Sequence, residues 1–266
     1  LDTLDKAGIR RVGAGRNLQE AWEPSILEVD GVRLGLLGFS TTLPLGSAAG
    51  PSRPGVAAVR IRTTIILDPT SRFQEQPGAP PPVMTMPWAE DVRRLEMAIH
   101  QARERADMVM VAPHWGLGLP PNYLIMSYQQ ELGHKMVEAG ADIILGTHPH
   151  LIQPIEAYKG GFIFYSLSNF LFHRFPPDSG AYLQWPSYDP KSVYDRMSKE
   201  SAIIYVPIKQ GKITELEFIP ICLNEEGNPE MADRKTAHSI IDRTAKLSEQ
   251  YGTRFVRKDG RVLISG

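Results

Sequence analysis

Cysteine is almost absent from this chain, and so are long apolar runs and any excess of charge. The 266 residues contain one cysteine, Cys222, which excludes an internal disulfide but leaves the cellular compartment open. The longest apolar runs are strand-length and interrupted, so we expect no membrane-spanning segment, and the chain shows no signal peptide. The formal net charge is -1, and we therefore expect no nucleic-acid partner.

What is present is typical of a globular protein. Hydrophobic residues make up 42% of the chain and charged residues 22%, enough for one large domain or two small ones. The chain begins without methionine, in residues 1–8, which read as the last turns of a helix closed by Gly8. We therefore expect further residues upstream of Leu1.

Turn signals in the first 40 residues predict a strand, a short helix and a hairpin. Residues 9–12 are expected to form a short strand, and Asn17 with Glu20 has capping-box spacing for a helix. Asp-Gly separates the apolar runs 26–29 and 32–39, a strong signal for a β-hairpin.

Residues 41–86 are rich in proline and glycine and predict a long irregular insertion with one edge strand at 61–67. Long ordered loops often cover a substrate, but a loop without a function fits equally well.

From residue 87 onward, helices and strands alternate. Helical spacing covers 88–102 and 127–140, and buried strands are expected at 108–112 and 142–145. Strand–helix–strand units with continuous apolar runs indicate parallel strands buried on both faces. Further on, we expect hairpins at 153–167 and 202–219, a helix at 231–251 and a small hairpin around 259–260.

Three histidines follow the two buried strands. His114 follows the first, and residues 146–150, Gly-Thr-His-Pro-His, place His148 and His150 after the second. Pro149 favours extended backbone at His148, in which the residues at i and i+2 point to the same side. Ligands of such sheets bind beyond the carboxyl ends of the strands, and neutral imidazole suits zinc, iron, nickel or copper. We favour a metal site over two polar turns that merely contain histidine.

The remaining candidates are weaker. His100, His134 and His238 fall within expected helices and are interpreted as surface or partly packed side chains, while His173 is left open. Arg16 could hold a substrate anion, although a tight turn before a capped helix is the better interpretation of residues 13–17. No dinucleotide, P-loop or Gly-x-Ser-x-Gly pattern is present.

In order, these segments resemble the capsule-synthesis CapA family (poly-γ-glutamate synthesis) of the calcineurin-like metallophosphoesterase superfamily. The matching segments are 12–17, 114–116, 139–150, 153–156 and 163–170. The resemblance covers a domain of residues 1–220, and we interpret 221–266 as a helix and hairpin extension of that domain. Ser168 stands where the family usually has glycine, and His173 where it commonly has aspartate.

The resemblance implies an α/β fold, a metallophosphoesterase-like β-sandwich flanked by helices, here lacking its amino-terminal part. It implies two divalent metal ions of the Mn, Fe or Zn class, with His114 and His148 on one metal and His150 on the other. Carboxylate and Asn/His ligands would come from motifs preceding Leu1. Arg16 and Asn169 are candidate substrate-binding residues.

The implied function is hydrolysis of a phosphoester or a peptide-like amide by a metal-bridging hydroxide. The alternative is a non-catalytic subunit that binds or guides an anionic polymer in a capsule-synthesis membrane complex. Family analogy suggests an extracytoplasmic, membrane-associated setting.

Overall fold

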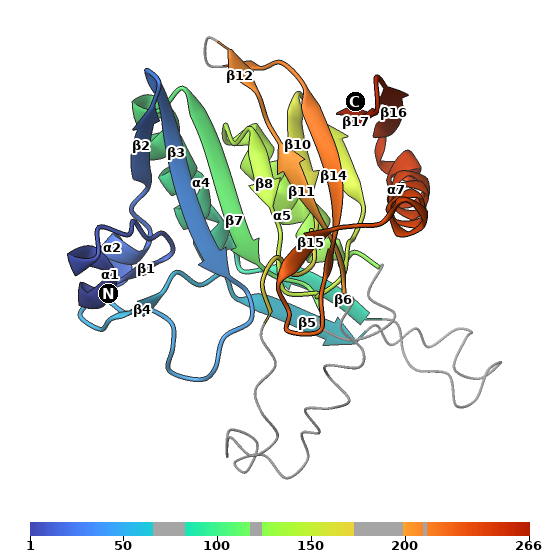
Figure 1. Ribbon diagram of the computed structural model, residues 1–266. Coiled ribbons are helices and arrows are strands. Elements are labelled where there is room, and N and C mark those ends of the chain that lie inside the picture. Colours follow the sequence, from blue (N-terminus) through green and yellow to red (C-terminus); the bar gives the residue numbers. More distant parts are fainter. Residues whose placement is uncertain (66–82, 118–123, 173–198, 210–211) are drawn as a thin grey trace, which may run out of the picture.

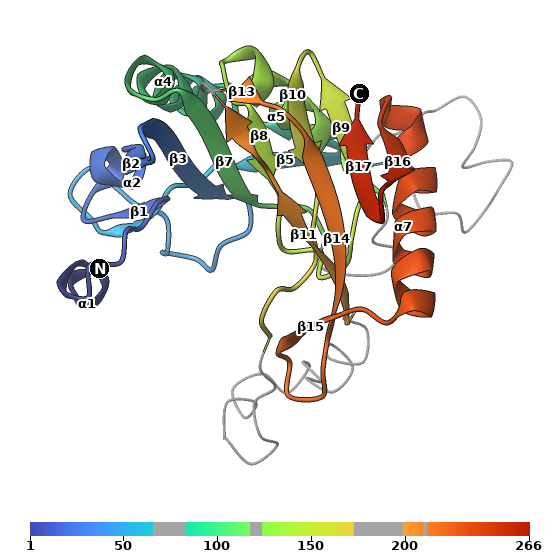
Figure 2. The ribbon, with the colours of Figure 1, turned by 45° about the horizontal axis from the view of Figure 1, so that its top comes forward.

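In the computed structural model, two β-sheets face each other and helices flank them (Figures 1 and 2). The structure describes residues 1–65, 83–117, 124–172, 199–209 and 212–266. The central sheet has six strands in the order β2-β3-β7-β8-β10-β9, of which β3, β7, β8 and β10 run parallel. Their bounds are β2 Ser25–Val29, β3 Val32–Ser40, β7 Met108–His114, β8 Ile143–Leu145, β9 Ile155–Tyr158 and β10 Gly161–Phe164.

The second sheet is antiparallel, in the order β11-β14-β17-β16, with β15 also paired to β14. Helix α7 (Arg234–Ser248), followed by the short helix η1 (Glu249–Tyr251), lies beside this sheet (Figure 2). The strands are β11 Glu200–Tyr205, β14 Leu216–Leu223, β15 Pro229–Met231, β16 Arg254–Lys258 and β17 Arg261–Ser265; a small ribbon pairs β12 Ile208–Lys209 with β13 Lys212–Ile213.

Side chains of the central strands alternate between two hydrophobic cores. In β7, Val109 and Val111 join the core that also contains buried residues of α4 (Ala89–Arg105) and α5 (Ser127–Glu138). Met108 belongs to the other core, together with residues of the second sheet and α7. This period-2 division is the reason why the strands are apolar throughout. The expected β-sandwich flanked by helices is confirmed.

Three of the four hairpin predictions are confirmed by the backbone at their turns, while the turn of the fourth, at 210–211, lies outside the described residues. Both residues have positive φ at Asp30-Gly31, at Lys159-Gly160 and at Asp259-Gly260. Two consecutive residues with positive φ fit the tight turns whose twist matches that of paired strands. The strands β2–β3, β9–β10 and β16–β17 pair across these turns.

The amino-terminal prediction needs a correction. Residues 9–12 are not a strand; the short strand is β1 (Ala14–Gly15), which pairs with β4 (Gly55–Val56). The extended conformation is interrupted at Gly13, whose φ is +72°. Because Gly13 has no side chain, it can contact the backbone of Gly38. The helix expected in residues 1–8 is confirmed as α1 (Asp2–Lys6).

Part of the insertion forms a second ribbon. β5 (Ile61–Ile65) pairs with β6 (Val83–Pro87), and residues 66–82 lie outside the described residues. β6 ends at Pro87, and α4 begins at Ala89, close to the start of the expected helix at 88–102. Among the described helices, none has both the length and the apolar character that crossing a bilayer requires.

A buried ion pair anchors the start of α4 to the insertion. Asp91, with a side chain only 2% exposed, accepts hydrogen bonds from Nε and Nη2 of Arg60 at 2.8 and 2.9 Å. Burial raises the pKa of Asp91, but the contacts with Arg60 outweigh burial and leave the pKa below its ordinary value.

Replacing Asp91 should therefore cost more stability than replacing its exposed neighbour. We expect Asp91→Ala to lower the free energy of unfolding by about 1–3 kcal/mol, because the amide and the half-exposed guanidinium of Arg60 lose a charged acceptor. Urea denaturation measures this. The control Glu90→Ala, whose side chain is 59% exposed, should change stability by no more than about 0.5 kcal/mol. Equal effects would contradict the prediction.

Candidate functional site

The three histidines stand at the carboxyl ends of two neighbouring parallel strands. His114 is the last residue of β7, while His148 and His150 lie in the turn after β8. The strand ends are held in register beyond the sheet: the amide of Trp115 donates to the carbonyl of Thr147 at 3.1 Å, and that of Thr147 to the carbonyl of Pro113 at 3.0 Å. The backbone next to the histidines is therefore held in place by hydrogen bonds between the two strand ends.

The structure brings the three imidazoles together. The ring centroids of His114 and His148 are 4.5 Å apart, and those of His148 and His150 are 6.0 Å apart. Within the described ranges, however, no three His, Cys, Asp or Glu side chains are arranged to hold a metal ion. These histidines can thus supply part of a ligand set, and their role as ligands stays a prediction.

The backbone of the histidine turn is not the extended segment that Pro149 suggested. His148 has a φ of 101° and His150 a φ of 58°. Positive φ is unfavourable for residues with a Cβ atom and is tolerated where the surrounding structure enforces it. The proximity of the two rings therefore comes from a constrained turn and not from strand alternation.

The electrostatics of the cluster favour neutral imidazoles. Burial, followed by the neighbouring His114 and His150, lowers the pKa of His148 to about 4. Burial and then His150 lower the pKa of His114 as well. Neutral imidazole is the form that can donate a lone pair to a metal, so both side chains are ready for coordination near pH 7.

Asn169 contacts the cluster directly. Its Oδ1 lies 2.7 Å from Nδ1 of His150, and Phe172 packs edge-on against the same ring with centroids 5.3 Å apart. With Nδ1 donating to Asn169, Nε2 of His150 keeps the free lone pair. Its predicted role in substrate binding is untested, and the structure places Asn169 where it orients His150. The preceding Ser168 adopts φ 72°, which explains why glycine is usual there.

A buried aromatic pair underlies the histidine turn. The indole Nε1 of Trp115 donates to the carbonyl oxygen of Tyr165 at 2.9 Å, and the two rings stack with centroids 5.9 Å apart. A Cβ atom on Gly146 would lie 2.1 Å from that carbonyl oxygen and 2.4 Å from the indole nitrogen. Only glycine fits at this position.

Tyr165 also belongs to a second group of hydrogen-bonded side chains, for which the sequence had predicted no function. Its hydroxyl donates to Oε2 of the buried Glu156 at 2.5 Å, and Oε1 of Glu156 is 2.8 Å from Nε2 of His134. His134 also stacks on Tyr158 with centroids 3.7 Å apart. His134 is therefore partly packed, as expected. Trp115, Glu156 and Tyr165 all lie in the segments that resemble the family. The resemblance did not assign a role to any of them.

The other candidates are placed as follows. His100 and His238 are exposed, as expected, and His173 lies outside the described residues. Arg16 forms ion pairs with Asp2, Asp5 and Glu20. The preferred interpretation of residues 13–17 is confirmed, because Oδ1 of Asn17 accepts from the amide of Glu20 at 2.9 Å and caps α2 (Leu18–Ala21). Binding of a substrate anion by Arg16 stays a prediction.

An open hollow of about 420 Å³ lies beside His114. It is lined by the carboxyl ends of β3 and β7, including Ser40 at the end of β3 and Thr42 beyond it, and by Gly13. This volume can hold a small ligand or one unit of a larger one. His114 is the histidine of the cluster that lines this hollow.

Fold and site together define an α/β sandwich protein with a histidine-lined edge on its parallel strands. The family model described as "Bacterial capsule synthesis protein PGA_cap" matches residues 1–174, and the chain belongs to this family.

Three relatives illustrate the similarity. The capsule biosynthesis protein CapA of Bacillus anthracis is 27% identical over 99% of this chain and 52% of its own length. The PGA biosynthesis protein CapA of Bacillus subtilis is 32% identical over 84% of this chain and 46% of its own length. A probable polyglutamine synthesis accessory protein of Mycobacterium tuberculosis is 22% identical over 98% of this chain and 60% of its own length. The chain thus spans about half the length of the two Bacillus relatives.

The close approach at Gly146 can be tested by adding one methyl group. We expect Gly146→Ala to lower the free energy of unfolding by about 2–3 kcal/mol, because the new Cβ meets backbone and a buried indole. Thermal or urea denaturation provides the measurement. Gly50→Ala is the matched control, since its Cβ would meet its nearest neighbour, Cβ of Arg53, at an ordinary 3.4 Å. If both variants are equally stable, the packing described here is wrong.

The low pKa of His148 is measurable by NMR in metal-free protein. Between pH 6.5 and 4 the unfolded chain takes up a proton at this histidine and the folded chain does not. The contribution of His148 therefore favours folding less as the pH falls through this window, and it is constant above pH 6.5. We expect its imidazole resonances to titrate with a midpoint near 4. A midpoint at 6.5 would refute the burial argument.

Proposed function

We propose that this chain carries the histidine side of a two-metal hydrolase site that acts in bacterial capsule synthesis. The observation that supports the proposal is the meeting of His114, His148 and His150 at the edge of two parallel strands, beside an open hollow. Imidazoles that burial keeps neutral are suited to bind metal and poorly suited to bind an anion by charge.

The donor chemistry fits divalent ions of the Mn, Fe or Zn class. His114 and His148, whose rings are neighbours, would hold one ion, and His150 the other. Asn169 would fix the orientation of His150 through Nδ1. Bound ions supply Lewis acidity toward a scissile bond and stabilise developing negative charge. We propose that the carboxylates that would complete the site correspond to a part of the relatives' length that this chain does not span.

The proposed substrate is a capsule polymer made of anionic units, and the bond that is cleaved links two of these units. The relatives are named for capsule and PGA biosynthesis, which favours a γ-glutamyl amide of poly-γ-glutamate, with a phosphoester as the other class. Family analogy is the basis on which we further propose an extracytoplasmic, membrane-associated setting. Gly13 and Ser40, which line the hollow, offer room for such a unit next to His114.

A second function is a non-catalytic subunit that binds or guides the anionic polymer. It is favoured by the lack, among the described residues, of three side chains arranged around a metal position. The name of the mycobacterial relative, a probable accessory protein, points the same way.

Metal content and hydrolysis distinguish the two functions. The whole protein should bind divalent metal and cleave a γ-glutamyl amide or a phosphodiester in a metal-stimulated way. We expect His148→Ala and His150→Ala each to lower the rate at least about a hundredfold, because even indirect partners of a metal cost 10- to 100-fold. His238→Ala, an exposed histidine on α7, is the control and should be unchanged.

The opposite result is equally informative. Protein without bound metal, whose hydrolysis does not respond to added Mn, Fe or Zn, would rule out the hydrolase. Polymer binding that survives loss of His148 and His150 would then favour the accessory function.

A further inference from the structure

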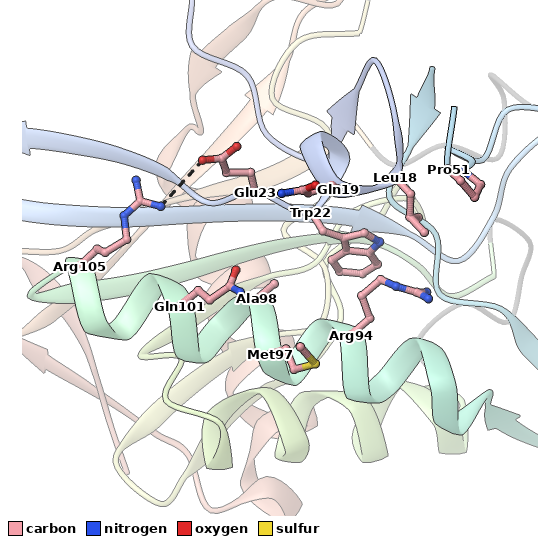
Figure 3. Close-up of a pocket in the computed structure, with 10 residues that line it drawn as sticks. All are labelled: Leu18, Gln19, Trp22, Glu23, Pro51, Arg94, Met97, Ala98, Gln101 and Arg105. Atoms are coloured by element: carbon pink, nitrogen blue, oxygen red, sulfur yellow. Dashed lines mark ion pairs between the residues drawn. The ribbon is translucent and has the colours of Figure 1, made fainter. Parts of the chain in front are cut away.

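A groove on the helical side of the molecule is separate from the histidine site. It lies between α2 and α4, has a volume of about 490 Å³, and none of the three site histidines lines it (Figure 3). Its walls carry Trp22 and Gln19 from the α2 region and Arg94, Met97, Gln101 and Arg105 from α4.

The α4 residues form one line along the helix. Arg94, Gln101 and Arg105, together with Met97, are spaced by three, four or seven residues and share a face. With a rise of 1.5 Å per residue, the two arginines are about 16 Å apart along the axis. The groove therefore has a guanidinium toward each end and an apolar and amide-bearing middle (Figure 3).

The arginine at the far end is available to a ligand. Arg105 is 51% exposed, and its ion pair with Glu23 has an N···O distance of 4.0 Å, which is too long for a hydrogen bond. Arg94 differs, because it contacts Glu90 and Asp91 at 3.1 and 3.3 Å. A carboxylate arriving in the groove can thus displace the weak contact of Arg105 at little cost.

The middle of the groove offers apolar surface and hydrogen-bonding groups. The Met97 side chain is 61% exposed. Trp22 is buried, and its indole N–H has no hydrogen-bond partner in the described part of the chain. Figure 3 shows the indole nitrogen on the side of the ring toward Leu18, with the Gln101 amide farther along α4.

We propose that this groove binds a segment of an acidic polymer whose units are joined by amide bonds. A carboxylate of the polymer pairs with Arg105, its amides bond to Gln19 and Gln101, and its methylene groups cover Met97. Arg105 supplies the complementary charge, because Glu23 is 4.0 Å away from it, whereas Arg94 is already paired with Glu90 and Asp91. The choice of polymer rests on the proposed role in capsule synthesis, whereas the groove itself does not depend on the histidine chemistry.

Binding of a γ-linked glutamate decamer, measured by calorimetry at low salt, tests the groove. We expect Arg105→Gln to weaken binding about three- to tenfold, as loss of a charge-assisted contact does. Met97→Glu should weaken it further by placing a like charge in the groove. Arg93→Gln, an exposed arginine on another face of the same helix, is the charge-matched control and should bind as the parent does. Melting temperatures verify that the variants are folded.

The outcomes separate this inference from the proposed hydrolase. Binding that survives His148→Ala but falls in Arg105→Gln supports the groove whether or not the protein hydrolyses anything. Equal losses in Arg105→Gln and Arg93→Gln would mean non-specific charge attraction and overturn it. Loss of binding in His148→Ala alone would assign the polymer to the histidine site instead. Equal affinity for polyphosphate would refute the amide-linked class.

Discussion

The contact of Trp115 with Tyr165 across Gly146 is the constraint on which the histidine site depends. The indole spans the gap between the end of β7 and the chain leaving β10, and the turn after β8 passes through this gap. Because Gly146 has no side chain, three strand ends can meet within hydrogen-bonding distance. Glu156 extends the same contact by accepting from the Tyr165 hydroxyl. The histidines are thus placed by a buried network and not by a surface loop.

This anchoring explains how the turn tolerates two histidines with positive φ. Each such residue is unfavourable by itself, and a free loop would relax to another conformation. Held at both ends, the turn keeps His148 against His114, where burial and neighbouring imidazoles disfavour protonation. Backbone strain and a lowered pKa therefore have one common cause, which is the packing beneath the turn. Such combinations are typical of functional sites.

Local signals in the sequence were sufficient for much of the fold. Asp30-Gly31 and Lys159-Gly160 specify their hairpins by themselves, and apolar runs such as 108–112 identify buried parallel strands. Tertiary contacts decided the rest. The start of α5 shows this: the hydroxyl of Ser127 bonds to the distant Thr85, and the side chain of Gln129 accepts from the amide of Met126. The positive φ values at the site had no local signal, since they arise from residues distant in sequence.

Close packing of α4 against β3 connects the groove with the strand ends that carry the histidines. A Cβ atom on Gly35 of β3 would lie 3.0 Å from Cβ of Ala106 and 3.3 Å from Cβ of Ala102, so small residues bring the helix against the sheet. β3 then runs from Gly35 to Ser40, which pairs in register with His114 on β7. Because interiors this dense are rigid, α4 and the strands that end at the histidines share one packed support.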